Sequence, residues 1–247
     1  MTEPISKKEF IEHLFFVFEQ NGLGSLLTED KADKFFYLTE RMLSENEKYN
    51  LTAIKEPRKI ILNHYADCAA LAIHLPNSAT LADIGCGAGF PTLPLAILRE
   101  DLKITAIDST AKRVAYVAES ARLLGLSGLN AVTMRAEDGG KSPQYREKFD
   151  FVTARAVAEL RILAELCLPY VKCGGKMLAM KGKNAEAELL AAKSAIKALG
   201  GGKTVCQEIS LSSDEETLTH PLIVIDKEKH TPQNFPRPYS QISKKPL

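Results

Sequence analysis

A short apolar run that leads into three alternate glycines constrains this chain more than any other stretch. It reads Thr80-Leu-Ala-Asp-Ile-Gly-Cys-Gly-Ala-Gly-Phe-Pro91. The residues before the glycines predict a buried strand, and the residues from Pro91 to Leu98 predict a helix. Glycine lets a backbone turn sharply and lie against a ligand. A strand, a glycine loop and a helix in this order therefore predict a nucleotide-binding loop.

The spacing of the glycines separates two kinds of ligand. A dinucleotide loop reads GxGxxG and aims a helix N-terminus at a pyrophosphate. This loop reads GxGxG, with Phe90 and Pro91 where the third dinucleotide glycine would come. A ring and a proline there would crowd a pyrophosphate, but they tolerate an amino-acid–nucleoside conjugate without phosphates. The loop favours S-adenosylmethionine over NAD.

An acidic residue, Asp108, ends the next predicted strand, 103–108. A carboxylate at this position accepts hydrogen bonds from ribose hydroxyls. Asp108 therefore indicates an adenosine-type ligand without saying which one. The alternative is a solvated acid at a strand end.

The rest of the chain alternates strands with helices. Further strands are predicted at 131–134, 149–154, 175–180, 203–209 and 222–225, and helices at 111–124, 160–171 and 185–199. We expect a Rossmann-like α/β domain over residues 77–230, with a seven-stranded, mostly parallel sheet and helices on both faces. Residues 1–76 read as an N-terminal helical extension. Residues 231–247 form a basic, Pro-rich tail for which we expect irregular structure.

Composition narrows the class of protein. The net charge is +1, from 32 basic and 31 acidic residues, so charge neither indicates nor excludes a nucleic-acid partner. No apolar run approaches the roughly 20 residues of a membrane helix. The five cysteines form no CxxC pair and no zinc-type cluster with histidine, so we expect reduced thiols and no metal site. We expect a cytoplasmic monomer.

Several motifs in a fixed order make the chain resemble one family. They are Tyr49-Asn-Leu-Thr-Ala-Ile54, His64-Tyr-Ala-Asp67, Asp83-Ile-Gly-Cys-Gly-Ala-Gly-Phe-Pro91, Asp108-Ser109 with Lys112-Arg113, Val152-Thr-Ala-Arg-Ala-Val157 and Met180-Lys-Gly182. From about residue 35 to its C-terminus the chain resembles the RsmG (GidB) family of bacterial methyltransferases. It departs from the family at Cys86, where Thr or another small residue is usual, and at Ser240-Gln-Ile242, where many members read Gly-Thr-Pro.

The resemblance implies an enzyme that transfers a methyl group from S-adenosylmethionine to N7 of one guanine in 16S ribosomal RNA, in the decoding-region loop of the small subunit. It also implies a set of cofactor-binding residues: Gly85, Phe90, Asp108, Ser109, Thr110, Ala136, Glu137 and Arg155. Gly85 and Phe90 would line the methionine and ribose side. Backbone groups of Ala136 and Glu137 would read the adenine edge.

No catalytic base is predicted. The fourth strand ends in Thr153-Ala-Arg-Ala156, where amine methyltransferases carry an Asn-Pro-Pro-aromatic motif. A Pro-Cys pair for attack on a pyrimidine is also missing from the sequence. Guanine N7 has a lone pair and needs no proton removed, so holding N7 in line with the methyl group can supply the catalysis.

Contacts with RNA are predicted only as candidates. Asn50 and His64 belong to family motifs near the expected substrate opening, although His64 also suits a buried, hydrogen-bonded histidine. Candidates for phosphate contact are Arg58, Lys59, Lys112, Arg113, Lys181, Lys183, Lys244 and Lys245. A solvated surface side chain is the alternative for each of them.

Other functions remain open. The glycine spacing and the lack of a hydride-transfer constellation disfavour a nicotinamide-dependent oxidoreductase. A methyltransferase of another RNA base, or a non-catalytic assembly protein that binds ribosomal RNA and retains a cofactor loop, is also compatible with the sequence. The intact Asp83, Asp108 and loop glycines argue against a decayed site.

Overall fold

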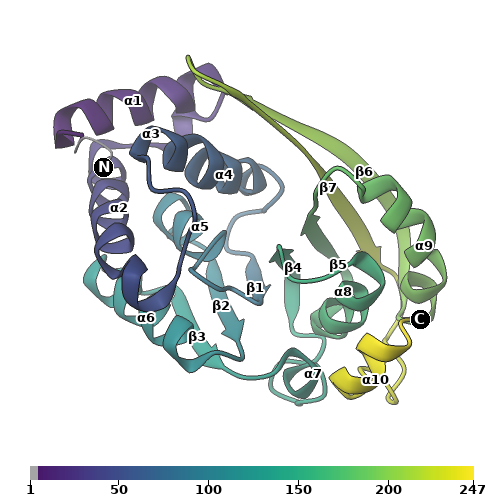
Figure 1. The fold of residues 1–247 in the computed structure, drawn as a ribbon. Coiled ribbons are helices and arrows are strands. Elements are labelled where there is room, and N and C mark those ends of the chain that lie inside the picture. The colour runs from purple at the N-terminus through teal and green to yellow at the C-terminus, as the bar shows by residue number, and fades with distance from the viewer. Residues whose placement is uncertain (1–4) are drawn as a thin grey trace.

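The computed structural model describes residues 5–247, and a seven-stranded sheet organises them (Figure 1). The strand order is β3-β2-β1-β4-β5-β7-β6. The strands are β1 (Thr80–Ile84), β2 (Lys103–Asp108), β3 (Leu129–Thr133), β4 (Phe149–Arg155), β5 (Val171–Met180), β6 (Gly201–Ser212) and β7 (Thr217–Lys227). β7 is antiparallel to both β5 and β6, and the other pairs are parallel. The predicted seven-stranded, mostly parallel sheet is confirmed.

Helices cover both faces of the sheet, as predicted. One face carries α1 (Lys7–Gln20), α2 (Glu29–Tyr49), α3 (Pro57–Ile60), α4 (Asp67–Ala72), α5 (Thr92–Leu98) and α6 (Ala111–Leu123). The other face carries α8 (Leu160–Cys167), α9 (Ala185–Ala198) and α10 (Tyr239–Lys244). A short helix, α7 (Ala136–Gly139), follows β3. Each face has its own apolar core against the sheet.

The N-terminal helices begin where local signals place them. Ser6 and Glu9 form a capping box at the start of α1, and the Thr28 side chain caps α2. α2 ends at Asn50, which adopts the left-handed conformation with φ 49°. Phe10 and Phe35 are fully buried in a core that these helices share with the sheet. These rings are therefore core residues.

The β6–β7 hairpin is longer than predicted. The sequence indicated strands at 203–209 and 222–225, because the residues between them are mostly polar. In the structure β6 and β7 stay paired from Gly201–Lys227 out to Ser212–Thr217. Asn21, just after α1, holds the far end: its side chain accepts from the Ser212 N–H and donates to the Ser212 carbonyl, both at 2.8 Å. Backbone pairing and this distant contact extend the strands beyond their apolar residues.

The prediction of irregular structure throughout the tail is wrong. Residues 239–244 form α10, whose Ile242 is fully buried in the core on the α8–α9 face. A helix this short is unstable alone and depends on tertiary packing. Within residues 5–247, no helix is long and apolar enough to span a membrane.

Candidate functional site

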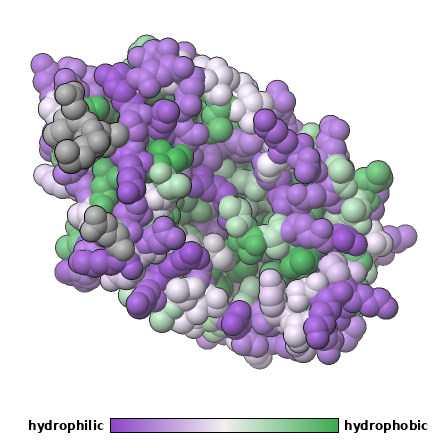
Figure 2. Space-filling view, in the orientation of Figure 1, coloured by the Kyte–Doolittle hydropathy of each residue, from purple (hydrophilic) through white to green (hydrophobic). Residues whose placement is uncertain are grey.

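A cavity of about 270 Å³ opens at the carboxyl ends of β1, β2 and β4 and beyond the end of β3. This edge is where open α/β sheets bind ligands. Figure 2 shows the molecule hollowed near its centre, with apolar residues inside the hollow. Six of the eight predicted cofactor residues line the cavity: Gly85, Asp108, Ser109, Thr110, Ala136 and Glu137.

Asp108 lies at the centre of this edge and is held by backbone amides. Its Oδ2 accepts the Gly87 N–H at 3.0 Å, and its Oδ1 accepts the Thr110 N–H at 2.8 Å. A carboxylate has about four acceptor sites, so each oxygen keeps capacity for a further donor. The carboxylate is therefore oriented by the protein and still able to accept from two vicinal hydroxyls.

Two of the loop glycines are required by the fold itself. Gly85 has φ 75°, and a Cβ there would lie 2.7 Å from Cγ2 of Val157 across the cavity edge. Gly89 has φ 88°, and a Cβ there would lie 2.6 Å from Cδ1 of Leu93 in α5. Gly85 lines the cavity, whereas Gly89 lets the loop pack against α5. The glycine pattern thus reflects both a ligand surface and strand-to-helix packing.

The short helix α7 determines which backbone hydrogen-bonding groups after β3 are available to a ligand. The Ala136 carbonyl accepts Tyr170 Oη at 2.7 Å and the Gly140 N–H at 2.9 Å. Both acceptor sites of this carbonyl are occupied, so it is not free to read an adenine edge. The N–H groups of the first helical turn have no partner within a helix, and those of Ala136 and Glu137 are the groups left for a ligand.

Phe90 and Arg155 do not line the cavity. The Phe90 ring stacks on the His64 ring, with centroids 4.5 Å apart, and the Arg155 guanidinium lies 5.4 Å from the Phe90 centroid. Arg155 donates to Asp67 Oδ2 at 2.8 Å, towards α4. The next residue, Ala156, has φ 55°, and beyond it Val157 faces the cavity. These two predicted residues therefore belong to an adjoining cluster.

His64 is buried and hydrogen-bonded in that cluster, which is the second of the two interpretations that its sequence position allowed. Burial and, to a smaller extent, the nearby Arg155 guanidinium lower its pKa to about 4. Arg155 Nη2 lies 3.1 Å from Nδ1 of the ring, and an arginine can only donate. Nδ1 also lies 3.0 Å from the Asn63 carbonyl oxygen, and Nε2 lies 3.0 Å from Thr52 Oγ1.

Asp67 links the cluster to the sheet hairpin. It pairs with Arg155 and also with His220 of β7, whose pKa is raised by the hydrogen bond and charge of Asp67 against the opposing effect of burial. Asp83, at the end of β1, is fully buried and accepts Thr92 Oγ1 at 2.5 Å. Burial raises the pKa of Asp83 to about 7. These carboxylates join strands to helices beneath the cavity.

The phosphate-contact candidates divide into engaged and exposed side chains. Lys181 pairs with Glu188 at 2.7 Å and donates to the Ala158 carbonyl, so it is not an open phosphate contact. Arg58 lies within 4 Å of Asp214 and Glu215 on the hairpin turn. Arg113 lines the cavity, and Lys112, Lys183, Lys244 and Lys245 are not buried.

Other lining residues were not predicted as cofactor contacts, although Arg113 was a candidate for phosphate contact and Ala156 and Val157 belong to a family motif. They are Ile84, Ile107, Arg113, Met134, Arg135, Ala156, Val157, Leu166 and Tyr239. Four of them, Ile84, Ile107, Arg135 and Ala156, directly precede or follow a predicted site residue, so including those neighbours would have found them. No sequence signal marks Leu166 or Tyr239. Within residues 5–247, no group of three or more His, Cys, Asp or Glu side chains is placed to hold a metal ion.

Solved structures with the same fold are methyltransferases at low sequence identity. A SAM-dependent O-methyltransferase from Thermotoga maritima aligns with a TM-score of 0.53 and 14% identity, over 77% of this chain and 72% of its own. A precorrin-6y C5,15-methyltransferase from Geobacter metallireducens aligns with a TM-score of 0.51 and 12% identity, over 74% and 96%. These similarities concern the fold.

Sequence relatives are closer. The ribosomal RNA small subunit methyltransferase G of Clostridium perfringens is 42% identical over 92% of this chain and 95% of its own length. The protein of the same name from Lactobacillus delbrueckii is 44% identical over 90% and 93%, and that from Leuconostoc mesenteroides 40% identical over 98% and 100%. The GidB family profile, described as rRNA small subunit methyltransferase G, matches residues 31–217. With this match over most of its length and a cavity built around Asp108, the chain belongs to the GidB family of small-subunit ribosomal RNA methyltransferases.

Proposed function

We propose that this protein transfers a methyl group from S-adenosylmethionine to N7 of one guanine in 16S ribosomal RNA. Asp108 carries the proposal, because its carboxylate is fixed at the sheet edge with acceptor capacity for a ribose. The methyl acceptor is inferred from family membership, since the relatives are named as methyltransferases of small-subunit ribosomal RNA. The decoding-region guanine follows from the resemblance to that family.

The residues present suit this cofactor. Asp108 would accept the two ribose hydroxyls, with Ser109 and Thr110 beside it. The N–H groups of Ala136 and Glu137 would meet the acceptor nitrogens of the adenine. Gly85 would leave room for the methionine end.

Phe90 and Arg155 act differently in this proposal. They lie outside the lining of the cavity, and they connect the glycine loop and the end of β4 to His64 and Asp67.

The chemistry needs little from acid–base groups. When bound, the cofactor supplies an electrophilic methyl group on a sulfonium. The described residues that line the cavity include no histidine, lysine or cysteine. Guanine N7 needs no deprotonation, so the protein's task is to exclude water and to align N7 with the methyl group.

Three further features belong to the proposal. We assign residues 1–76 to an N-terminal extension, whose described helices α1 to α4 pack on a methyltransferase domain at 77–230, and residues 231–247 to a C-terminal tail. The protein acts as a monomer. It acts in the cytoplasm, where small ribosomal subunits are found.

Methyl transfer tests the proposal directly. The purified protein is incubated with S-adenosylmethionine and small ribosomal subunits that lack the modification, and the RNA is digested for nucleoside mass spectrometry. We expect new 7-methylguanosine at one site. A different methylated nucleoside would overturn the N7 assignment and keep the cofactor. If the protein binds the cofactor but methylates neither subunits nor free 16S RNA, the assignment of 16S RNA as the methyl acceptor is wrong.

A further inference from the structure

The C-terminal tail packs on the domain after β7, and its helix α10 begins beside the cavity. After β7 the chain passes α7 and forms α10 next to α8, seen in yellow in Figure 1. Gly140, just after α7, leaves room for the tail, since a Cβ there would lie 3.0 Å from Cγ of Pro236. The basic tail is therefore packed on the domain rather than extended from it.

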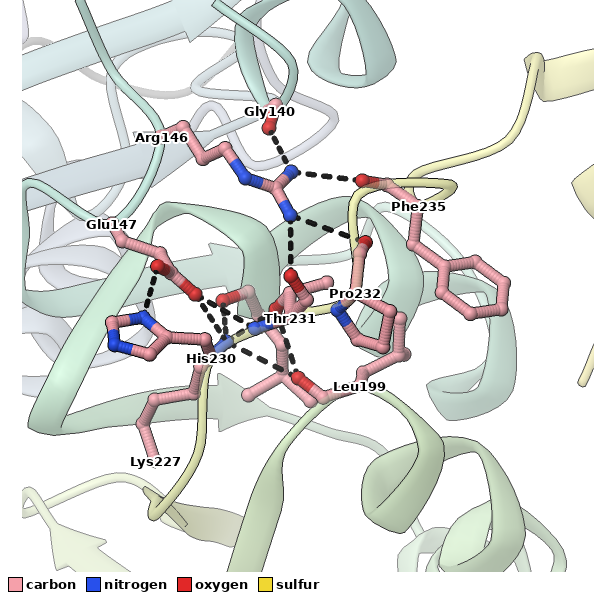
Figure 3. Close-up of polar contacts among 10 residues, drawn as sticks. Gly140, Arg146, Glu147, Leu199, Lys227, His230, Thr231, Pro232 and Phe235 are labelled. Carbon is pink, nitrogen blue, oxygen red and sulfur yellow. Dashed lines mark hydrogen bonds and ion pairs between the residues drawn. The ribbon is translucent and has the colours of Figure 1, made fainter. Parts of the chain in front are cut away.

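Arg146 fastens the start of the tail (Figure 3). Its Nη1 donates to the carbonyls of Gly140 and Phe235, both at 2.8 Å. Its Nη2 donates to the carbonyls of Thr231 and Pro232 at 2.6 and 3.2 Å. One planar guanidinium thus satisfies three carbonyls of the tail and one of the domain.

Lys227 and Glu147 form a second attachment beside it (Figure 3). Lys227 is buried, and its Nζ donates to the carbonyls of Leu168 at 2.7 Å and Leu199 at 3.1 Å, and to Thr231 Oγ1. Glu147 accepts the Thr231 N–H at 2.7 Å. Burial lowers the pKa of Lys227 to about 8, against the attraction of Glu147.

A third attachment lies directly before α10. The fully buried Glu165 of α8 accepts the backbone N–H of Arg237 at 2.8 Å, and its two oxygens accept Nε at 2.9 Å and Nη2 at 2.6 Å. Such a two-pronged pair sets direction as well as distance. With Ile242 buried behind it, the start of α10 is held against α8.

These attachments bring Tyr239 to the cavity wall. Tyr239 is the first residue of α10 and lines the cavity with Leu166 of α8 and with Ala136 and Glu137 of α7. It remains 42% exposed, so its ring is accessible to a ligand. Two residues that line the same cavity, Ala136 and Glu137, are those proposed to meet the adenine.

We propose that Tyr239 is a cofactor-binding residue that covers the base of the bound nucleoside, and that the tail serves to present it. This inference rests on the proposed function, because it takes the purine of S-adenosylmethionine as the ligand. An aromatic ring stacked on a base strengthens binding without reading its edge. Leu166 supplies an apolar surface beside the same base.

Calorimetry with S-adenosylhomocysteine and with adenosine tests the inference. We expect Tyr239→Ala to raise both dissociation constants about tenfold. Tyr239→Phe keeps the ring and should stay within about twofold of the parent protein. Tyr37→Ala, which removes another exposed tyrosine from α2, is the matched control and should change neither constant.

The outcomes separate this inference from the proposed function. Unchanged binding of both ligands by Tyr239→Ala overturns the inference alone. A loss for S-adenosylhomocysteine but not for adenosine also overturns it, because the ring would then contact the amino-acid part. A higher KM for the ribosomal subunit with unchanged cofactor binding would assign Tyr239 to RNA instead. Failure of the parent protein to bind either ligand overturns the proposed function itself.

Discussion

The carboxylate of Asp108 accepts the backbone N–H of Gly87 at 3.0 Å, and this contact joins the end of β2 to the glycine loop after β1. The loop and the acid were separate signals in the sequence. In the structure each orients the other, since the Thr110 N–H holds the second carboxylate oxygen at 2.8 Å. A change at Asp108 therefore alters the loop as well as the ribose contact.

We expect Asp108→Asn to weaken cofactor binding by about 2–3 kcal/mol. An amide has one acceptor oxygen, so its NH₂ group must face either the Gly87 or the Thr110 N–H, and hydrogen bonds to a charged acceptor are also lost. Titration calorimetry with S-adenosylhomocysteine measures this. Asp30→Asn, which changes an exposed acid of α2 paired with Lys34, is the control. Equal affinities for the two variants would show that Asp108 does not hold the ribose.

Gly89→Ala should destabilise the protein by about 2–4 kcal/mol, because a new Cβ meets Leu93 and the backbone is left-handed. Gly22→Ala is the matched control: its φ is 69°, but nothing lies within 4 Å of an added Cβ. Gly22→Ala should lower the free energy of unfolding by about 1 kcal/mol, which is the penalty of the left-handed backbone alone. Urea denaturation gives both values. Similar losses in the two variants would mean that contact with α5 is unimportant.

Acid should destabilise the protein partly through His64. Its folded-state pKa, about 4, lies below the unfolded value of 6.5, so its contribution is complete above 6.5 and is lost as the pH falls towards 4. The loss between pH 7 and pH 5 is about 2 kcal/mol. His64→Gln removes the titration, so the variant should lose about 2 kcal/mol less over that interval. Denaturation curves at both pH values compare the proteins.

Arg155 and Asp67 act on this histidine, and His220, which pairs with Asp67, titrates with the opposite sign. Its raised pKa means that its contribution is present at low pH and is lost as the pH rises through that value. Because both proteins keep His220, its effect cancels in the comparison. Parallel pH profiles for the parent and His64→Gln would contradict the lowered pKa of His64.

The Glu165–Arg237 pair should behave as a coupled unit. Arg237→Met leaves the fully buried Glu165 carboxylate without its partner, and we expect a loss of about 3 kcal/mol. Adding Glu165→Gln removes the buried charge, so the double variant should be more stable than Arg237→Met alone. Urea denaturation of the two single variants and the double variant measures the coupling. A double variant less stable than Arg237→Met would show that the buried charge carries no penalty.

The prediction of the fold succeeded where the signal was local. The strands at 80–84 and 103–108 have the predicted bounds, since apolar residues there meet clear stops at glycines and an acid. The prediction was incomplete for elements that strand pairing or tertiary packing stabilises and that have no apolar periodicity in the sequence. The polar half of the β6–β7 hairpin and the short helices α7 and α10 carry too few apolar residues to be recognised.

The amino-acid sequence by itself determined the alternation of strands and helices, the glycine loop, the acid at the end of β2 and the family. Each of these depends on residues close together in the chain. Only the tertiary structure decided that Arg155 faces Asp67 and His64 rather than the cavity, and that Tyr239 lines it. Those placements depend on contacts such as Arg237 with Glu165 and Arg146 with the tail, between segments far apart in the sequence. The spacing of residues along a chain does not show which buried polar groups from distant segments will form hydrogen bonds with each other.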